Sequence, residues 1–369
     1  MRIAVIQDYL RMGGTESQAI SLSRYWQEQG EEVVLITYRP GGALEARLRE
    51  SPELHRIALQ QKDRCLNWYA PRLADVLKEW IPDAMVFFGR NGHRYASLLG
   101  RRIPQAATVA TFRTRRFLPL AYRRALRETD RVIANSEAGA NRLLTEGLVS
   151  REKLRVVRNG LLRPVPRKGE LHALRTRVRT RMGLSEETRL FLYLGSFVPG
   201  KRVGWLIDAL APLAGDWRLV LVGDGKGRIG LERKWRIHPK IHFMGASETP
   251  EEYLAAADLM VTASMEEGLP NALIEAQAWG LAVVAFDIEG VKETMLPGQT
   301  GELLQPKDGA AAFRSAVEHW GWHASEGGVV AEFAGSFIQK RFGAEERAKE
   351  MLEFIREAVG EKRNGFAQG

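Results

Sequence analysis

Apolar strands alternate with helical segments along the whole chain, and this alternation restricts the possible folds more than any other feature. Strands that are joined through helices pair in parallel and are buried on both faces. The pattern therefore predicts the α/β class, and 369 residues are enough for two such domains. The expected strands form two series: Arg2–Gln7, Val33–Thr37, Ala84–Phe88, Ala107–Thr111 and Arg131–Ala134, then Leu190–Leu194, Leu219–Val222, Ile241–Phe243, Leu259–Thr262 and Ala282–Phe286.

A proline-flanked basic stretch, Arg163–Gly169, lies between the two series and is typical of a linker. We expect an N-terminal Rossmann-like domain over residues 1–163 and a C-terminal Rossmann-like domain over residues 164–342. A charged amphipathic helix over about residues 343–362 follows, and we expect Arg363–Gly369 to be a frayed tail.

Two carboxylates, Glu267 and Glu275, stand eight positions apart between two expected strands. Pro270 suits the first position of a short helix, which leaves the backbone N–H groups around Gly268 to Leu273 without intrahelical partners. Such N–H groups bind anions, for example a diphosphate. Glu275 falls in the second turn and Glu267 in the loop before the helix. This arrangement is typical of a nucleotide-sugar site; the alternative is an amphipathic helix with one capping carboxylate and one solvated carboxylate.

The segment resembles the E-x7-E signature of retaining nucleotide-sugar glycosyltransferases of family four. That family has the GT-B fold, in which two Rossmann-like domains place their parallel sheets across a cleft. The resemblance implies that Glu267 lies beside the donor sugar and that Glu275 holds the ribose hydroxyls. It also implies that the last helix packs back on the N-terminal domain, and it gives donor contacts to three more residues, Gly268, Leu269 and Asn271.

Two loops that follow strands extend the resemblance. Gly13 and Gly14 match the GG-x-E loop of the family, where the Gly14 amide would touch the donor phosphate or the transferred sugar. Lys201 matches the lysine of a G-R-x-x-x-x-K loop, and a fixed cation there stabilises the charge that develops on the leaving diphosphate. Ser196 stands where the family has arginine, so one cation is lost, and Arg202 or an arginine from the other domain is a candidate to replace it.

The nucleotide base has two candidate contacts. Gly223 begins a glycine turn that resembles the family's turn near the base, and Met244 lies in a short strand that resembles the strand contacting it. The glycine turn also partly matches a dinucleotide fingerprint, but its third glycine falls at Arg228, so we discount a dehydrogenase. Later in the chain, Glu289-Gly290 stands where the family has a double glycine.

Arg113 occupies the position where many family members place a histidine beside the sugar. A guanidinium can contact a hydroxyl or a phosphate but is no base at neutral pH. His93, after another expected strand, is an alternative histidine for the cleft; a surface loop residue is an equal interpretation. The chain has no Asp-x-Asp motif, so we expect a donor site that needs no metal and no cofactor.

The formal net charge is +9, and arginines crowd the stretch from Arg90 to Arg181. This bias favours an anionic glycan or glycolipid acceptor and peripheral contact with the inner membrane surface; a solvated basic surface is the alternative. We expect no nucleic acid, because no zinc-finger, RNA-recognition or helix-turn-helix signature is present. The single Cys65, the absence of a secretory signal and of an apolar run of ~20 residues predict a cytoplasmic protein.

These features together predict a retaining, metal-independent glycosyltransferase that moves a sugar from a nucleotide-diphosphate sugar to an acceptor hydroxyl. A lipopolysaccharide, a capsule or another envelope glycan would fit the basic N-terminal half as acceptor. The catalytic candidates are Glu267, Lys201, Arg113 and His93. Two alternatives stay open: a GT-B-like nucleotide-sugar epimerase or binding protein, and a basic nucleic-acid-binding α/β protein.

Overall fold

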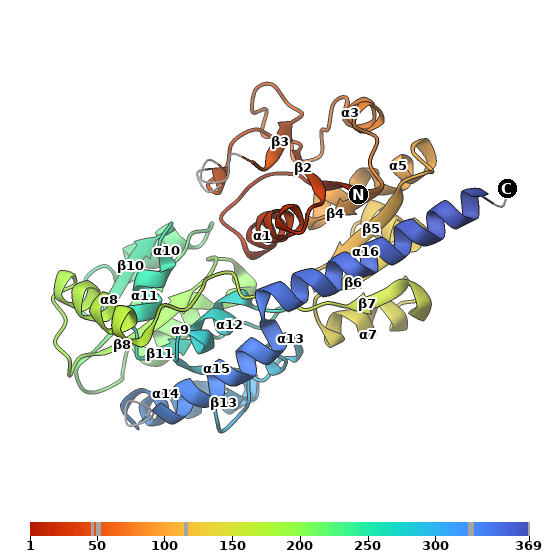
Figure 1. Cartoon of the computed structure of the whole chain (residues 1–369). Helices are drawn as coiled ribbons and strands as arrows, with labels where there is room; N and C mark the ends of the chain where they lie inside the picture. The colour runs from red at the N-terminus through yellow and green to blue at the C-terminus, as the bar shows by residue number, and fades with distance from the viewer. Residues whose placement is uncertain (46–47, 49–52, 114–116, 324–327, 368–369) are drawn as a thin grey trace. The chain divides into compact units, whose positions relative to one another are not determined.

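The chain divides into two units, each built around one parallel sheet (Figure 1). The structure is a computed structural model that describes all residues except 46–47, 49–52, 114–116, 324–327 and 368–369. Unit 1 comprises Met1–Leu162 and Gly343–Gly369, and unit 2 comprises Arg163–Phe342.

The sheet of unit 1 has seven parallel strands in the order β3-β2-β1-β4-β5-β6-β7. The central strands β1, β4 and β5 are buried apart from Arg2 at the start of β1, as their continuous apolar sequences predict. Strand order reverses between β1 and β4, so the loops after these two strands flank the switch point. The bounds are β1 (Arg2–Gln7), β2 (Glu32–Thr37), β3 (His55–Ala58), β4 (Ala84–Phe87), β5 (Ala107–Phe112), β6 (Arg131–Ala134) and β7 (Leu154–Val156).

Helix α16 (Ala344–Ala367), the last of the chain, packs in unit 1. The indole N–H of Trp26 in α1 donates to the Ala348 carbonyl oxygen at 3.1 Å, and Ile355 belongs to the same hydrophobic core as Ile3. The other helices of unit 1 are α1 (Gly14–Glu28), α3 (Leu73–Trp80), α4 (Gly89–Gly92), α5 (Ala96–Arg102), α6 (Leu120–Glu128) and α7 (Glu137–Thr145), with short 3₁₀ turns at His93–Tyr95 and Arg151–Lys153.

The end of α16 differs from the expectation of a frayed tail from Arg363 onward, because the helix continues to Ala367. Ion pairs with unit 1 hold this last part. Lys362 Nζ lies 2.7 Å from Asp130 Oδ1, and Arg363 Nη2 lies 2.6 Å from Asp83 Oδ1. The segment that we expect to fray is therefore helical as far as Ala367, and its first residue, Arg363, pairs with Asp83.

The sheet of unit 2 has six parallel strands in the order β10-β9-β8-β11-β12-β13, and the order reverses between β8 and β11. Its strands are β8 (Arg189–Leu194), β9 (Trp217–Val222), β10 (Ile241–Gly245), β11 (Leu259–Val261), β12 (Ala282–Phe286) and β13 (Gly301–Leu304). Its helices are α8 (Lys168–Arg181), α9 (Val203–Leu210), α10 (Arg228–Trp235), α11 (Pro250–Ala256), α12 (Asn271–Ala278), α13 (Glu289–Lys292), α14 (Gly309–His323) and α15 (Gly328–Phe342), with 3₁₀ turns at Pro199–Lys201 and Pro306–Asp308. Two parallel sheets with connecting helices confirm the predicted fold class.

Helix α8 begins at Lys168, inside the stretch that we expected to be a linker. Two of its arginines are structural. Arg175 Nη1 donates to the last carbonyl oxygens of α11, including that of Ala257 at 2.8 Å, and the buried Arg179 donates to Asp258 Oδ2 at 3.3 Å. Some of the arginines of the basic stretch therefore bind groups within unit 2, and their charge is not available to an anionic partner.

Candidate functional site

The candidate site of unit 2 lies at the carboxyl ends of β8 and β11, on either side of the switch point. Open α/β sheets bind ligands at this place, because the loops diverge there. The Met265 N–H after β11 donates to the Gly200 carbonyl oxygen after β8 at 2.9 Å. Across the same gap, Lys201 Nζ forms an ion pair with Glu267 Oε1. The structure thus brings together the two residues expected to act on the leaving group and on the sugar.

The Lys201–Glu267 pair is accessible to a ligand. The Lys201 side chain is 22% exposed and the Glu267 side chain is 11% exposed. Tyr193 is buried near Glu267, and its phenol donates a hydrogen bond to the Ser196 carbonyl oxygen at 2.9 Å. Burial, together with the charge of Glu267, raises the pKa of this phenol. Ser196 itself is exposed. A phosphate that enters here therefore meets one ammonium group whose position is set by a neighbouring carboxylate.

Arg202, the candidate to replace the missing cation at Ser196, is held by aromatic rings. Its Cζ lies 4.9 Å from the ring centroid of Trp205 and 5.7 Å from that of Phe286. Its Nη1 lies 3.4 Å from Met265 Sδ, so the guanidinium borders the motif loop. The guanidinium of Arg202 therefore makes cation–π contacts with these two rings.

Helix α12 carries Glu275 in its second turn, as the spacing predicts. It starts at Asn271, one residue later than expected, because Pro270 is the N-cap residue and not the first helical residue. The Pro270 carbonyl oxygen accepts the Leu273 N–H at 3.1 Å. The Glu275 side chain is 3% exposed, and its Oε2 lies 2.5 Å from Nη1 of Arg163. The motif gave no indication of Arg163, which we had assigned to the linker.

Helix α13 packs directly against the backbone of the loop that carries Glu267 and Gly268. A Cβ atom on Gly290 would lie 2.3 Å from the Gly268 carbonyl oxygen and 2.6 Å from the Glu267 carbonyl oxygen. Only glycine permits this approach, because a side chain would collide with the backbone. Leu269, next in the loop, is buried.

The glycine turn after β9 packs on the loop after β8. Gly223 has φ +138°, and a Cβ atom there would lie 1.9 Å from the Gly195 carbonyl oxygen. The Phe197 N–H donates to the Asp224 carbonyl oxygen at 2.9 Å. Gly223 therefore lies beside the Ser196 loop, whereas Met244 lies on edge strand β10, where it is 40% exposed.

Gly13 and Gly14 belong to unit 1, where they connect β1 with α1. Gly13 is the N-cap residue of α1 and Gly14 is exposed at the first helical position. A Cβ atom on Gly13 would lie 2.5 Å from Oε2 of Glu16, the acidic residue of the same loop. Burial raises the pKa of the Glu16 carboxyl. The Glu16 carboxylate therefore lies directly against the backbone of Gly13 at the start of α1.

A polar cluster that the motif did not predict lies at the switch point of unit 1. Asp8, after β1, accepts hydrogen bonds from Asn91 Nδ2 at 2.8 Å and from Arg11 Nη2 at 3.0 Å. Arg11 also lies 3.4 Å from Glu16. Each of these residues follows β1 or β4, so the sheet order brings them together.

His93 is fully buried, which contradicts its interpretation as a surface loop residue. Its Nδ1 lies 2.5 Å from the Gly89 carbonyl oxygen, its Nε2 lies 3.2 Å from the Thr111 N–H, and its ring stacks on Tyr122. These contacts assign the proton to Nδ1 and occupy both nitrogens. Burial lowers the pKa of His93 to about 4, so the ring is neutral at neutral pH. This environment weighs against the expected catalytic role.

Arg113, at the end of β5, is held by neighbours within unit 1. Its Nη1 donates to Asn159 Oδ1 at 2.5 Å, and its Cζ lies 5.2 Å from the centroid of the Phe88 ring. Desolvation lowers the pKa of the guanidinium to about 10, so it remains a cation at neutral pH. It can donate to a ligand but cannot act as a general base.

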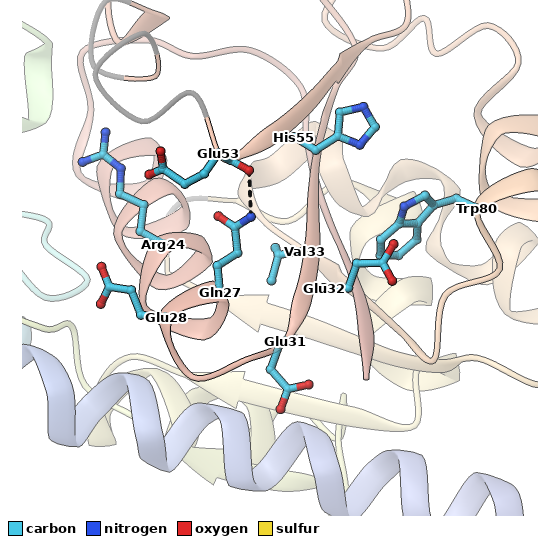
Figure 2. Close-up of a pocket in the computed structure, with 9 residues that line it drawn as sticks. All are labelled: Arg24, Gln27, Glu28, Glu31, Glu32, Val33, Glu53, His55 and Trp80. Carbon is cyan, nitrogen blue, oxygen red and sulfur yellow. Dashed lines mark hydrogen bonds between the residues drawn. The ribbon is translucent and has the colours of Figure 1, made fainter.

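A hollow of about 520 Å³ opens at the opposite end of the unit 1 sheet, beside the amino ends of β2 and β3 (Figure 2). Gln27 Nε2 donates across it to the Glu53 carbonyl oxygen at 3.0 Å. Two of its carboxylates are paired: Glu31 with the N-terminal amine and with Arg356, and Glu32 with Arg2. It lies away from the carboxyl-end loops of the candidate site. Within the described ranges, no group of three or more His, Cys, Asp or Glu side chains is placed to hold a metal ion.

Comparison with known proteins gives two family matches. A family model described as Glycosyltransferase Family 4 matches residues 12–161, and one described as Glycosyl transferases group 1 matches residues 188–320. Together the two matches cover most of the chain, and each falls within one of the two units.

Individual relatives agree with these matches. The chain is 28% identical over 321 residues to the lipopolysaccharide core biosynthesis glycosyltransferase LpsE of Rhizobium meliloti, covering 83% of this chain and 85% of that protein. It is 31% identical over 172 residues to the putative teichuronic acid biosynthesis glycosyltransferase TuaC of Bacillus subtilis, covering 47% of this chain and 43% of that protein. The alignment thus spans less than half the length of TuaC.

Solved structures share the fold. Anabaena HepE in complex with UDP-glucose superposes with a TM-score of 0.78 at 19% identity, covering 97% of this chain and all of that chain. WaaG, a glycosyltransferase involved in lipopolysaccharide biosynthesis, superposes with a TM-score of 0.73 at 17% identity, covering 96% and 99%.

Proposed function

Because the chain belongs to the family 4 (group 1) glycosyltransferases and has their GT-B fold, we propose that it catalyses sugar transfer with retention and without a metal ion. The donor is a nucleotide-diphosphate sugar. The acceptor is a hydroxyl group of a lipopolysaccharide, a capsule or another envelope glycan. The sequence similarity to LpsE supports this acceptor class, and the UDP-glucose bound by HepE supports this donor class.

The Lys201–Glu267 pair at the switch point of unit 2 is the observation that carries the proposal. A diphosphate gains negative charge as the sugar leaves, and a lysine held in place stabilises that charge more in the transition state than in the ground state. Glu267, across the pair, would orient the sugar hydroxyls. Glu275, in the second turn of α12, would accept the ribose hydroxyls.

The proposed reaction breaks the bond between the anomeric carbon and the diphosphate and forms a bond between that carbon and the acceptor oxygen. The acceptor proton passes to an oxygen of the leaving diphosphate on the same face of the sugar. This route needs no protein base. It agrees with the environments of His93, whose nitrogens are occupied, and Arg113, which stays protonated.

We also propose that unit 1 contacts an anionic membrane surface while the enzyme works. Phe117 and Leu120, at the start of α6, are 79% and 83% exposed. Arg90 Nη2 donates to the Phe117 carbonyl oxygen at 3.1 Å, and Arg124 and Arg127 are exposed on α6. Exposed apolar side chains beside arginines are typical of proteins that lie on a bilayer.

Arg115 and Arg116, two arginines of the stretch from Arg90 to Arg181, lie outside the described residues. In the part of the chain that the structure describes, the helices are too short or too polar to cross a membrane. The contact that we propose is with the surface of the bilayer.

A thermal-shift screen of UDP-, GDP- and ADP-sugars tests the donor half of the proposal. A selective donor should raise the unfolding temperature, because a ligand that binds only the folded state stabilises it. The transfer rate with that donor should not change when EDTA is added. If none of these sugars binds, the proposed function is wrong.

Two substitutions then test the site. Lys201→Ala should lower kcat by about a hundredfold or more while nucleotide affinity changes less, because its charge acts in the transition state. Glu275→Ala should weaken nucleotide binding by about tenfold or more. Lys234→Ala, which removes an exposed lysine that pairs with Asp208, is the matched control and should leave both constants unchanged. Normal activity of both site variants with the true donor would show that the site is misassigned.

A further inference from the structure

Arg163, the first residue of unit 2, contacts the carboxylate that we propose for ribose recognition. Its Nη1 lies 2.5 Å from Glu275 Oε2, and its Nε lies 3.3 Å from Glu251 Oε2 in the first turn of α11. One guanidinium therefore joins α11 to α12. It reaches the second turn of α12 from the segment that enters unit 2.

Burial makes this contact important for the state of Glu275. The Glu275 side chain is 3% exposed and that of Arg163 is 15% exposed. A buried carboxylate without a compensating charge is strongly disfavoured, and loss of one partner from a buried pair leaves the other uncompensated. Arg163 supplies the compensating charge at direct contact distance.

The shape of the guanidinium adds a directional effect. Its nitrogens lie in one plane and donate at fixed angles. With Nε on Glu251 and Nη1 on Glu275, the plane is fixed by two carboxylates from two helices. The Glu275 carboxylate is in turn fixed through Oε2. A carboxylate offers about four acceptor positions, so an ion pair at one oxygen leaves capacity for hydroxyl donors.

We propose that Arg163 is a positioning residue for ribose recognition: it fixes the charge and the orientation of Glu275 so that this carboxylate accepts the ribose hydroxyls of a nucleoside diphosphate. The proposal rests on the proposed function, because it takes Glu275 as the ribose acceptor. It adds a residue that lies outside the E-x7-E segment and acts through Glu275 without touching the reacting atoms.

Ribose discrimination is the measurement that separates positioning from a purely structural role. Binding of UDP, GDP and ADP, and of their 2′-deoxy counterparts, is measured by calorimetry. The wild-type protein should bind the ribose form of its nucleotide about tenfold or more tightly than the 2′-deoxy form, because a hydrogen bond to a charged acceptor is lost. Arg163→Met should weaken ribose-form binding by about tenfold to a hundredfold and 2′-deoxy-form binding much less.

Three further variants complete the experiment. Arg163→Lys keeps the charge without the planar fork and should restore part of the ribose preference. Arg163→Met in a Glu275→Gln background should cause no further loss of preference, since the two residues act as one unit. Glu251→Gln, which removes the other partner of the same guanidinium, should change the preference less than Arg163→Met.

Each result has a definite meaning. If Arg163→Met weakens both nucleotide forms equally, or lowers only the unfolding temperature, Arg163 is structural and the inference is overturned, while donor binding stands. If the wild-type protein binds nucleotides without preferring ribose, the inference and the ribose role of Glu275 both fall. If the wild-type protein binds no nucleoside diphosphate, the proposed function itself falls and the inference falls with it.

Discussion

At the scale of single residues, burial decides what the ionisable side chains of this protein can do. His93 and Arg113 follow strands of unit 1, at positions where a sequence suggests access to a ligand. The structure surrounds His93 with the backbone of Gly89 and Thr111 and with the Tyr122 ring. The imidazole therefore links the backbone of Gly89 to that of Thr111 in β5, and neither ring nitrogen is left to act as a base.

This environment predicts a pH dependence of stability. The pKa of His93 is about 4 in the folded protein and about 6.5 when unfolded, so the unfolded chain binds more protons between these values. The contribution is fully present above pH ~6.5 and is lost as pH falls towards ~4, for a total of roughly 3 kcal/mol. Urea unfolding across this window should show the loss, and His93→Gln should flatten it.

The exposed His55 provides the control for that measurement. His55→Gln removes an exposed imidazole and should keep the loss of stability between pH 6.5 and pH 4, since His93 is unchanged. A His93→Gln variant that retains the full loss of stability between pH 6.5 and pH 4 would show that other groups cause it.

Some residues of the candidate site can be predicted from the sequence, and others cannot. Lys201 and Glu267 follow strands, and Glu275 lies in the second turn of a helix at motif spacing, so each can be recognised from neighbours in the chain. Arg163 cannot, because its contact with Glu275 depends on how α11 and α12 pack. Charge alone also cannot separate a structural arginine such as Arg179 from one that meets a ligand.

At the scale of elements, most strands could be predicted, and the exceptions have physical reasons. Strands β1 and β6 occupy the expected residues, because their apolar sequences are buried on both faces. Strands β3 and β7 were missed, since they lie at the sheet edges, are short and are only partly buried. Helix α16 extends beyond the expected end because its last charged residues find partners in unit 1.

The contact between α13 and the motif loop gives a prediction at this scale. Gly290→Ala would place a methyl group against the backbone oxygens of Glu267 and Gly268, so the loop or the helix must shift. We expect the free energy of unfolding to fall by about 1–3 kcal/mol, as in overpacked cores. Turnover should fall too, because Glu267 moves relative to Lys201. Chemical unfolding and steady-state kinetics measure the two effects.

A second glycine serves as the matched control. Gly230 lies in α10, and a Cβ atom there would meet nothing within 4 Å. Gly230→Ala should therefore keep the activity and raise stability slightly, as expected for alanine in a helix. Unchanged activity and stability in Gly290→Ala would contradict the close packing of α13 on the loop.

At the scale of the whole molecule, the net charge of +9 and the exposed apolar pair on unit 1 act together in the proposed membrane contact. Arg123 and Arg124 have acidic neighbours, since they lie 3.0 Å from Glu146 and 2.6 Å from Glu128, so their charge is partly compensated. The apolar pair Phe117 and Leu120 is therefore the sharper target for substitution. Each apolar side chain that enters the bilayer interface contributes up to about 1.5–3 kcal/mol.

Vesicle flotation measures this contribution directly. The wild-type protein should bind vesicles that contain phosphatidylglycerol more strongly than phosphatidylcholine vesicles, and the difference should shrink at high salt, because salt screens the arginines. The double variant Phe117→Ser/Leu120→Ser should bind anionic vesicles at least about tenfold more weakly. Ile237→Ser, which removes an 86% exposed isoleucine of unit 2, should bind like the wild type. Equal binding of the double variant and the Ile237 control would place the membrane contact elsewhere, and equal binding of neutral and anionic vesicles at all salt concentrations would remove the role of charge.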